Sequence, residues 1–405
     1  MSLGLSAIGG ILFLGGGSTV TIAQRMFEGM NSFALLAIPL YTFAGFTMSK
    51  GGISKRLMDF CYSIVGHIYG GLAHVNVLSS MIFAGISGSA VADTAGVSGM
   101  FMPEMVRKGY SKNFTVAVTA ISSTIGIIIP PSIPMVVIAG ICGISTGKLF
   151  LGGIIPGILC GLAQMIVSYF LAKKEGVPKE PGHFTIGPVL HGLWESWPAL
   201  LMPIIIVGTI TMGIVSPTEA GVIAVVYGLF AGGIIYRELK WEDIKFAFAE
   251  TVRTSGRIFI VIGAAKLYTV MLTTAGFDKW VAKTMLGFST NPTVILIVIL
   301  LIFFIVTMFM ESIATLTLFM PILYPIALGV GINPIVLSVL ITVVIGVGLV
   351  TPPVGMCIYV ACDLMDTTVG EVFPTLVPFI AATFVCIALM VAFPQLILLP
   401  TYLMA

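Results

Sequence analysis

Two stretches of the chain interrupt long apolar runs with a short polar patch that holds one acidic residue. Asp93 lies in SGSAVADTAGVSGMFMP and Glu311 lies in MESIATLTLFMP, and both patches end in the same Phe-Met-Pro triplet. The two acids are 218 positions apart, and so are the prolines of the two triplets. Each patch is followed by a Pro-Pro pair in a later apolar run, GIIIPPSIP at Pro130 and GLVTPPVGM at Pro352. Duplicated interruptions of this kind are typical of secondary transporters.

Composition places the chain in a membrane. Of its 405 residues, 58% are hydrophobic and only 9% are charged, and the mean hydropathy is +1.12. A soluble domain would carry about 25% charged residues. The formal net charge of +2 is too small to indicate a nucleic-acid partner. The six cysteines include no C-x-x-C pair, so the sequence indicates neither a disulfide framework nor a zinc site.

Several apolar runs are too short to cross a bilayer alone. A crossing helix needs about 20 apolar residues, but the runs at 72–86, 132–142 and 354–362 are shorter and lie beside the interruptions. Backbone that leaves a helix at membrane depth must be buried in protein or face a water-filled cavity. We therefore expect an all-α polytopic membrane protein in which residues 85–93 form the tip of a re-entrant hairpin.

Two hydrophilic stretches lie between the apolar runs. We expect residues 173–197 to link two repeats outside the membrane, and residues 237–257 to form an amphipathic helix on the membrane interface. Cytoplasmic loops are rich in Lys and Arg. This rule predicts a cytoplasmic location for the segment that begins at Arg237 and for five other basic residues: Lys50, Lys55, Arg56, Arg107 and Lys108.

The two acids are candidate cation ligands. An unpaired charge in an apolar surrounding costs several kcal/mol, and acids inside membrane segments usually face a cavity or an ion path. Hydroxyl oxygens lie nearby, on Ser87, Ser89, Thr94 and Ser312. Together with carbonyls freed at a broken backbone they form a hard-oxygen set that suits sodium rather than zinc. Alternatively, each acid caps a helix or pairs across the tip, and the two roles can coexist.

The Pro-Pro pairs predict two unwound segments. Proline removes a backbone donor and disfavours helix in the residue before it, so residues 127–129, and Val350 with Thr351, should be unwound at mid-membrane. Carbonyls at the end of a half-helix can coordinate a cation, and a half-helix N-terminus can hold a carboxylate. Two tips and two breaks therefore predict four interruptions around one central site.

Four segments carry a family resemblance: ISGSAVADTAG, STIGIIIPPSIPM, LLAIPLYTFAG and GHIYGGLAHVNV. They resemble the large membrane (M) subunit of tripartite ATP-independent periplasmic (TRAP) transporters, most densely over residues 33–171. Members of this family usually begin with a further apolar segment upstream, so a truncated or shortened first span is expected here.

The resemblance implies a multi-pass protein of the bacterial inner membrane. It implies an elevator-type transporter of the ion transporter superfamily with two inverted repeats, each with a re-entrant helical hairpin and a broken transmembrane helix. Its implied activity is sodium-coupled uptake of an organic acid, such as a C4-dicarboxylate or sialic acid, and not an enzymatic reaction. Its implied partners are a small four-helix membrane subunit (Q) and a periplasmic solute-binding protein (P).

On this basis we expect four parts of the chain. Scaffold helices occupy 1–66, and the first transport repeat occupies 67–172 with its break at 127–134. A linker, further scaffold helices and the interfacial helix occupy 173–256. The second transport repeat occupies 257–405 with its break at 348–355.

Candidate site residues follow from the resemblance, position by position. It implies that Na⁺ is the cofactor and that its ligands belong to two groups, one per repeat: Ser87, Gly88, Ser89, Asp93, Ile129 and Pro130; then Met310, Glu311, Ser312, Val350, Thr351 and Pro352. The substrate-binding residues predicted in the same way are Ser87, Ser89, Pro131, Ser132, Ser312, Thr315 and Pro353.

Other functions use some of the same residues. A cation channel would use similar acid and carbonyl chemistry but needs a continuous pore lined by repeated rings. An intramembrane serine protease would use the G-x-S-G pattern at Ser87, with His67 or His74 as base. A purely structural subunit would have no need for paired acids beside paired breaks. Lys266, alone in an apolar run, could pair with an acid, meet an anionic substrate or snorkel to the surface.

Overall fold

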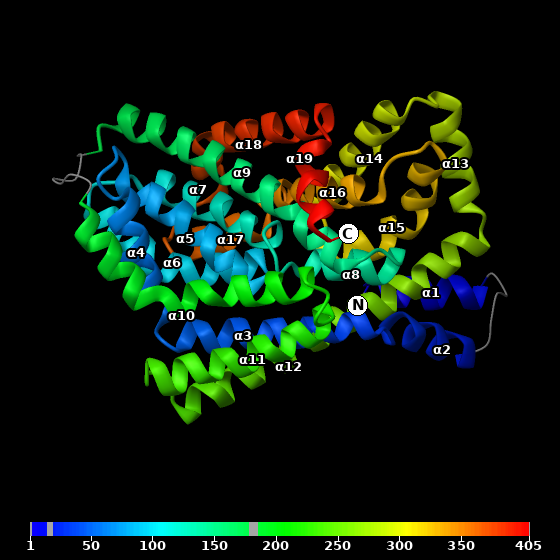
Figure 1. Cartoon of the computed structure of the whole chain (residues 1–405). Helices are drawn as coiled ribbons and strands as arrows, with labels where there is room; N and C mark the ends of the chain where they lie inside the picture. Colours follow the sequence, from blue (N-terminus) through cyan, green and yellow to red (C-terminus); the bar gives the residue numbers. More distant parts are fainter. Residues whose placement is uncertain (1, 14–18, 178–184, 405) are drawn as a thin grey trace.

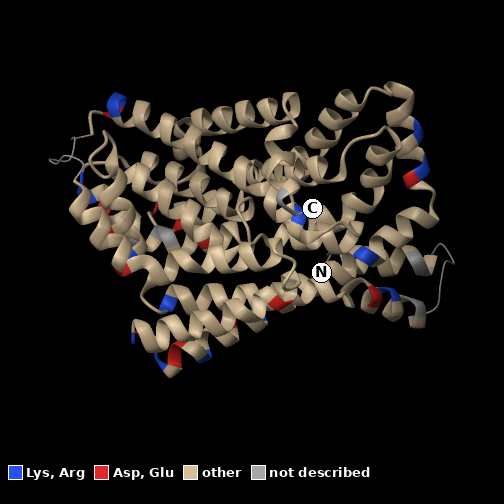
Figure 2. Ribbon diagram, in the orientation of Figure 1, with Lys and Arg blue, Asp and Glu red and all other residues tan. Residues whose placement is uncertain are grey.

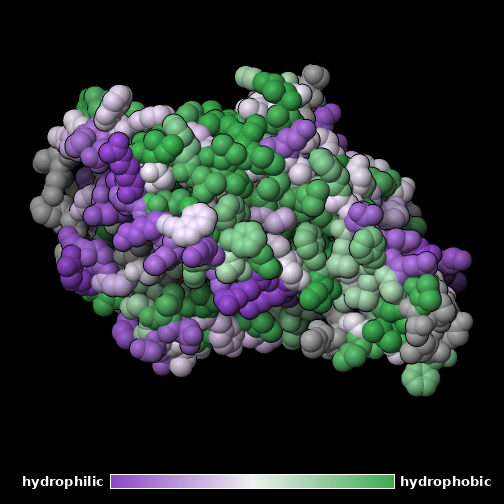
Figure 3. All heavy atoms as spheres, turned by 90° about the horizontal axis from the view of Figure 1, so that it is seen from below, coloured by the Kyte–Doolittle hydropathy of each residue, from purple (hydrophilic) through white to green (hydrophobic). Residues whose placement is uncertain are grey.

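The computed structural model describes residues 2–13, 19–177 and 185–404, and these ranges contain helices and connecting loops but no strand. Seven of the described helices are long and apolar enough to span a membrane. Charged residues lie mainly toward the two ends of the molecule (Figure 2). Hydrophobic side chains cover much of the middle of the face seen from below (Figure 3). The predicted all-α polytopic fold is confirmed.

The N-terminal helices form one layer with helices from the middle of the chain. The N-terminal elements are α1 (Ser2–Phe13), α2 (Thr19–Met30), the 3₁₀ turn η1 (Phe33–Leu36), α3 (Ala37–Lys50) and α4 (Ile53–Val65). The middle elements are α10 (Ile186–Thr211), α11 (Pro217–Phe230), the π-helical turn η3 (Ala231–Ile235) and α12 (Trp241–Thr274). α3 packs on α11 and α12, and α4 packs on α10 (Figure 1).

The middle of the chain is more helical than its composition predicts. α9 continues to Glu175 and α10 begins at Ile186, so much of the predicted linker at 173–197 is helix; residues 178–184 of that prediction, with His183, lie outside the described residues. The amphipathic stretch 237–257 is not a separate helix. It is the start of the 34-residue α12, which runs through residue 256 because no proline interrupts it.

The first repeat is a hairpin followed by a broken helix. Its elements are α5 (Gly71–Ser87), α6 (Ala90–Arg107), α7 (Lys112–Ser123), the 3₁₀ turn η2 (Thr124–Ile127), α8 (Ile133–Cys142) and α9 (Thr146–Glu175). α5 ends at Ser87, because the φ of 66° at Gly88 leaves the helical region, and α6 begins after Ser89. The break between η2 and α8 holds the first Pro-Pro pair, as predicted.

The second repeat has the same order of elements. These are α14 (Pro292–Thr307), α15 (Ser312–Gly329), α16 (Pro334–Gly348), α17 (Met356–Asp363) and α18 (Val369–Ala392), preceded by α13 (Phe277–Phe288) and followed by α19 (Gln395–Leu398) and the 3₁₀ turn η4 (Leu399–Met404). The hairpin is α14 with α15, and the break lies between α16 and α17.

The repeat register is 222 residues, not the 218 that the two acids and the Phe-Met-Pro triplets indicate. The caps Ser89 and Glu311 start two helices of equal length, and they are 222 positions apart. The same offset joins the first residues of α7 and α16, and it joins Pro130 to Pro352. The triplet match is therefore one helical turn out of register.

This shift changes which residues correspond. Glu311, at the tip of its hairpin, matches Ser89 rather than Asp93. Asp93, inside α6, matches Thr315. The two acids therefore occupy different depths behind their tips, and the two repeats do not carry equivalent acid sites.

The two breaks meet at the centre of the molecule. α8 packs on α15 of the other repeat, and α17 packs on α6 and α7. α16 crosses η2 where Gly346 lies against Thr124, since a Cβ on Gly346 would come within 3.3 Å of the Thr124 Cβ. This crossing brings both unwound segments and both hairpin tips to one region.

The α3–α4 turn, the α6–α7 turn and the start of α12, which carry the predicted basic clusters, lie toward one end of the molecule, at the left in Figure 1. Arg56 bonds Glu238 at 2.7 Å and so joins the first turn of α4 to the segment before α12. At the α6–α7 turn, the Ser111 hydroxyl bonds Glu175 at 3.0 Å, and the Lys112 ammonium bonds the Met365 carbonyl at 3.1 Å. This end is the predicted cytoplasmic side, and α12 runs away from it.

Candidate functional site

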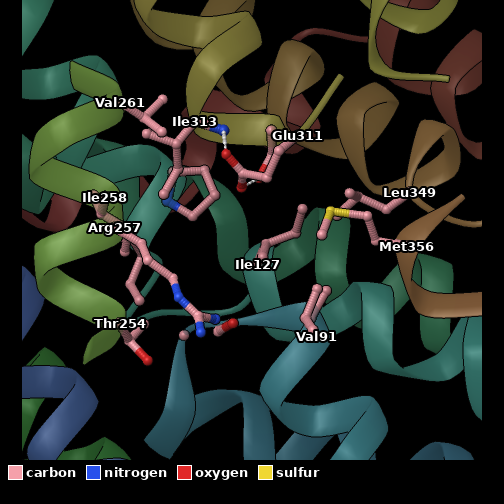
Figure 4. Close-up of a pocket in the computed structure, with 16 residues that line it drawn as sticks. Val91, Ile127, Thr254, Arg257, Ile258, Val261, Glu311, Ile313, Leu349 and Met356 are labelled. Carbon is pink, nitrogen blue, oxygen red and sulfur yellow. Dashed lines mark hydrogen bonds between the residues drawn. The ribbon is translucent and has the colours of Figure 1, made fainter. Parts of the chain in front are cut away.

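The two tips and the two breaks enclose a cavity of about 250 Å³, which we call the Arg257 chamber. Its lining comes from five places: Gly88, Ser89, Ala90 and Val91 at the first tip; Glu311, Ser312 and Ile313 at the second; Ile127, Ile133 and Pro134 at the first break; Leu349 and Met356 at the second; and Thr254, Arg257, Ile258 and Val261 on α12. Figure 4 shows this arrangement. The predicted convergence of four interruptions on one site is thus present.

The first tip is fixed by its own side chains. The Ser89 hydroxyl accepts a bond from the Ala92 amide at 3.4 Å and caps α6. The Ser87 hydroxyl accepts a bond from the Ser89 amide at 3.3 Å and donates to one carboxylate oxygen of Asp93. A serine before the turn and an acid after it therefore bridge the two arms of the hairpin.

The first tip is also docked on its own break. The Ile133 amide donates to the Gly88 carbonyl at 3.2 Å. Gly88 has a left-handed backbone, and a Cβ there would lie 2.7 Å from the Pro131 carbonyl oxygen. Only glycine satisfies both conditions without strain. The tip and the start of α8 thus form one hydrogen-bonded unit.

Asp93 lies behind the tip with one oxygen unsatisfied. The residue is fully buried, and its Oδ2 has no hydrogen-bond partner among the described residues. Oδ2 packs against Gly126 of η2, where any Cβ would collide with it. The hydroxyl of Thr94, the next residue, lies 2.5 Å from that of Ser123. A buried carboxylate oxygen without a partner is costly, and a bound cation would satisfy it.

Glu311 caps the helix that begins the second tip. Its Oε2 accepts bonds from the amides of Ile313 at 2.9 Å and Ala314 at 3.3 Å, and its Oε1 accepts one from the Ser312 hydroxyl at 2.7 Å. The Thr315 hydroxyl donates to the Glu311 carbonyl at 3.1 Å. Because Glu311 also lines the Arg257 chamber, its carboxylate serves as a cap and faces the cavity.

The second tip docks on its break in a similar way. The Val354 amide donates to the Met308 carbonyl at 2.9 Å. Gly348, at the end of α16, lies against Thr307, since a Cβ there would come 2.7 Å from the Thr307 Cβ. The Thr351 hydroxyl, in the unwound segment, donates to the Val347 carbonyl in the last turn of α16 at 2.7 Å. Both Pro-Pro bonds, in the first and the second break, are cis.

Some predicted site residues face the chamber and others do not. Those that line it are Gly88, Ser89, Glu311 and Ser312. Others form the tips and breaks around it: Ser87, Asp93, Ile129, Pro130, Pro131, Met310, Val350, Thr351, Pro352 and Pro353.

Two residues that were predicted to bind substrate form hydrogen bonds to backbone groups instead. The Ser132 hydroxyl donates to the Ile127 carbonyl at 2.5 Å and accepts from the Met135 amide at 3.3 Å, so it caps α8. Thr315 bonds Glu311 as described, and both hydroxyl-bearing residues are fully buried. Neither side chain lines the Arg257 chamber.

Arg257 is the residue that the sequence reasoning missed. It belongs to α12, and its side chain extends across the cavity toward the side of Val91 (Figure 4). Within the described parts of the chain its guanidinium has no hydrogen bond or ion pair. The available signal was a basic residue directly before the apolar run that starts at Ile258. An unpaired cation on a cavity wall is suited to an anionic ligand.

A serine protease site is not formed. The Ser87 hydroxyl donates to Asp93 rather than to a histidine. His74 lies in the first turn of the same helix, α5, where its Nε2 bonds the Tyr69 carbonyl at 3.1 Å. Thirteen residues of helix separate it from Ser87, which is roughly 20 Å. The residues of the G-x-S-G pattern serve the hairpin tip.

Paired hairpins that meet paired helix breaks around a cavity with a carboxylate and a guanidinium on its wall, in a membrane protein that is helical throughout its described residues, define a secondary transporter. Residues 1–396 match the family model described as "Tripartite ATP-independent periplasmic transporter, DctM component". The chain therefore belongs to the TRAP transporter family as a large permease subunit. It is a multi-pass protein of the bacterial inner membrane and a transporter subunit rather than an enzyme.

Two relatives show how widely the match extends. The sialic acid TRAP transporter large permease protein SiaM of Vibrio cholerae is 36% identical over 93% of this chain and 88% of that protein. The isethionate TRAP transporter permease protein DctMQ of Oleidesulfovibrio alaskensis is 36% identical over 94% of this chain, which spans 60% of that protein. The MtrF structure from Neisseria gonorrhoeae, an antimetabolite efflux pump, shares the fold with a TM-score of 0.64, at 14% identity over 94% of this chain and 85% of that one.

Proposed function

We propose that this subunit couples the inward movement of sodium to the uptake of an organic anion, which a periplasmic binding protein delivers. The observation that carries the proposal is the Arg257 chamber. Both tips, both breaks and an arginine that no other described residue pairs with face one space. Ligands that bind there contact both repeats at once, as the coupling of two solutes requires.

The acid head of the solute binds Arg257 in this proposal. A guanidinium can bond a carboxylate or a sulfonate through two parallel N–H groups. The chamber is also lined by the first residues of α6 and α15, and helix N-termini favour anions. The relatives are named for sialic acid, a carboxylate, and for isethionate, a sulfonate, which supports an organic anion as the substrate class.

The described residues fit sodium as the coupling ion. The polar side chains of both tips offer oxygen only, and no group of three His, Cys, Asp or Glu side chains occurs in the described part of the chain. Asp93 with Ser87 would hold one cation, and the unsatisfied Oδ2 of Asp93 supports this site. Glu311 with Ser312 would hold another. A bound cation would neutralise the negative charge of these carboxylates.

Coupling follows from the shared geometry of tip and site. A cation at Asp93 or Glu311 stabilises the tip that carries it, and the same tip forms a wall of the Arg257 chamber. Cation binding and solute binding therefore favour each other through the ordered tip. The loaded transport repeats would then cross the membrane against the α3–α11–α12 layer in an elevator movement.

Partners of two kinds are part of the proposal. The family is tripartite by description, and we propose that this chain works with a small membrane subunit and a periplasmic solute-binding protein. The solute reaches the large subunit from the side opposite the basic clusters, because the binding protein is periplasmic.

Uptake by proteoliposomes with the partner proteins tests the proposal. Radiolabelled sialic acid, succinate and isethionate are offered with external Na⁺, K⁺ or choline. We expect one of them to enter only with Na⁺. Arg257→Gln should lower the initial rate at low solute concentration at least about tenfold, because a hydrogen bond to a charged group is worth about 1.5–3 kcal/mol; Arg257→Lys should lower it less.

The matched control is Arg253→Gln on the same helix. Arg253 is exposed and pairs with Glu250 at 2.6 Å, so its loss should leave uptake unchanged. Uptake at equal rates with Na⁺, K⁺ and choline would contradict sodium coupling. Equal losses from Arg253→Gln and Arg257→Gln would contradict the anion role of Arg257.

A further inference from the structure

A second cavity lies along α12, and we call it the Lys266 chamber. It has a volume of about 370 Å³. The N-terminal segment contributes Asn31 and Ser32 to its wall, α8 contributes Gly140, α12 contributes Lys266, and α15 contributes Thr317. The cavity therefore lies between the N-terminal helices and both transport repeats, outside the enclosure of the two tips.

Three donor groups in this chamber have no partner within the described ranges of the chain. The Lys266 ammonium, the Asn31 amide and the Ser32 hydroxyl form no side-chain hydrogen bond or ion pair with the described residues. The acid that also lines the cavity, Glu28, is bonded to Arg25 at 2.9 Å. The unpaired side-chain charge in the chamber is thus positive, and its free groups can donate hydrogen bonds to an anion.

Lys266 is held toward the chamber by packing. A Cβ on Gly29 would come 2.7 Å from the Lys266 Cβ and 2.9 Å from its Cγ, so the lysine stem lies directly on the glycine. Gly29 therefore leaves room for the stem and fixes the direction in which it leaves α12. The contact therefore favours a Lys266 side chain that lines the cavity. It argues against a side chain whose position is set only by snorkelling to the membrane surface.

The two chambers follow one another along the same two helices. Ile258 of α12 lines the Arg257 chamber, and Ile262, one turn later, lines the Lys266 chamber. On α15, Ile313 lines the first and Thr317 lines the second. α12 packs on α15. Arg257 and Lys266 are nine residues apart, or roughly 14 Å along the helix axis.

Lys266 lies farther from the basic clusters than Arg257 does, since α12 starts beside the Arg56–Glu238 pair and runs away from it. We propose that the Lys266 chamber is a second anion site, which binds the carboxylate or sulfonate of the solute on its way to Arg257. The solute class in this inference rests on the proposed function. The anion selectivity of the chamber is argued from its lining residues and does not depend on that function.

Cysteine modification in the purified full-length protein tests the chamber without any transport. Ser32→Cys is introduced with Cys142→Ala, because the other five cysteines are buried. Two reagents of similar size are compared, anionic 2-sulfonatoethyl methanethiosulfonate and cationic 2-(trimethylammonio)ethyl methanethiosulfonate. Each rate is divided by the rate of that reagent with 2-mercaptoethanol.

We expect the anionic reagent to be favoured about tenfold or more, since a charged cavity raises the local concentration of its counter-ion by about 10–10³. Lys266→Gln should remove the preference and Lys266→Arg should keep it. Asn31→Cys is a second reporter in case Ser32→Cys fails to fold. Thr290→Cys, exposed outside the chamber, is the control whose reagent preference Lys266→Gln should not change.

A preference that persists in Lys266→Gln would overturn the proposal, and so would the absence of modification at both reporters. The result is independent of uptake. If the preference is present but no sodium-dependent uptake is found, the proposed function fails and the anion site remains. If uptake is sodium-dependent but the preference is absent, only the second site fails.

Discussion

Replacing Glu311 separates its two roles. Its carboxylate caps α15 through the amides of Ile313 and Ala314, and it faces the Arg257 chamber. Glu311→Gln keeps a carbonyl oxygen that can accept the capping bonds but removes the charge. Glu311→Ala removes both. The two variants should therefore differ in stability and agree in their loss of sodium binding.

The expected magnitudes are distinct. Loss of an N-cap lowers the free energy of unfolding by about 1 kcal/mol, up to about 2, so Glu311→Ala should be less stable than wild type by that amount without sodium. Glu311→Gln should lose less than about 1 kcal/mol. Sodium at 100 times its Kd stabilises a single site by about 2.7 kcal/mol. Both variants should lose this contribution and keep only that of the Asp93 site.

Thermal unfolding in detergent, followed by tryptophan fluorescence, measures both effects. NaCl is compared with choline chloride at the same ionic strength, so that general screening is constant. Wild type should unfold at a higher temperature in NaCl, and Glu311→Gln should show a smaller rise. Glu250→Gln, which removes an exposed i,i+3 pair, is the control and should respond as wild type does. A full sodium response in Glu311→Gln would refute the reasoning.

Three further substitutions probe the first tip. Gly126→Ala should abolish sodium-dependent uptake and lower the unfolding free energy by about 1–3 kcal/mol, because its methyl group would collide with the Asp93 carboxylate; Gly96→Ala, which has open space around it, is its control. Gly88→Ala should lower the unfolding temperature, because φ is 66° and the Pro131 carbonyl is 2.7 Å from the added Cβ; the left-handed backbone alone costs about 1–2 kcal/mol. Asp93→Asn should leave folding intact in gel filtration but reduce solute uptake, and wild-type uptake by a folded Asp93→Asn would contradict its cation role.

The tips and breaks could be predicted from the sequence because their causes are local. A polar patch in an apolar run cannot continue as a lipid-facing helix, and a Pro-Pro pair removes the donors that a helix needs. The observed tip, Gly88 with Ser89, lies inside the predicted range 85–93, and the observed break at 128–132 overlaps the predicted range 127–129. Both features depend on the residues themselves and not on their distant neighbours.

The two acids and the two triplets give the wrong correspondence between the repeats, whereas the two Pro-Pro pairs already match at the observed offset, and the reason is physical. The Phe-Met-Pro triplets match in letters, but helix caps set the structural register. Ser89 and Glu311 both cap, although one is a hydroxyl and the other a carboxylate. A comparison by residue type pairs Glu311 with Asp93, whereas the backbone pairs it with Ser89.

The chamber walls on α12 could not be derived from periodicity. Arg257 lies in an amphipathic stretch whose pattern suggests a helix on the membrane interface. Its meeting with the two tips depends on α12 continuing without a break and packing on α3 and α15. These are contacts between segments far apart in the sequence, and Lys266 acquires its surroundings in the same way.

The central claim is that cation and anion occupy one shared enclosure and move together. Flux of ²²Na⁺ into proteoliposomes that contain the subunit and its partners, measured with and without the transported solute, tests it most directly. We predict sodium influx that requires the solute and that falls sharply in Glu311→Gln and in Arg257→Gln. Sodium influx of the same size without solute would contradict the account and would indicate a channel.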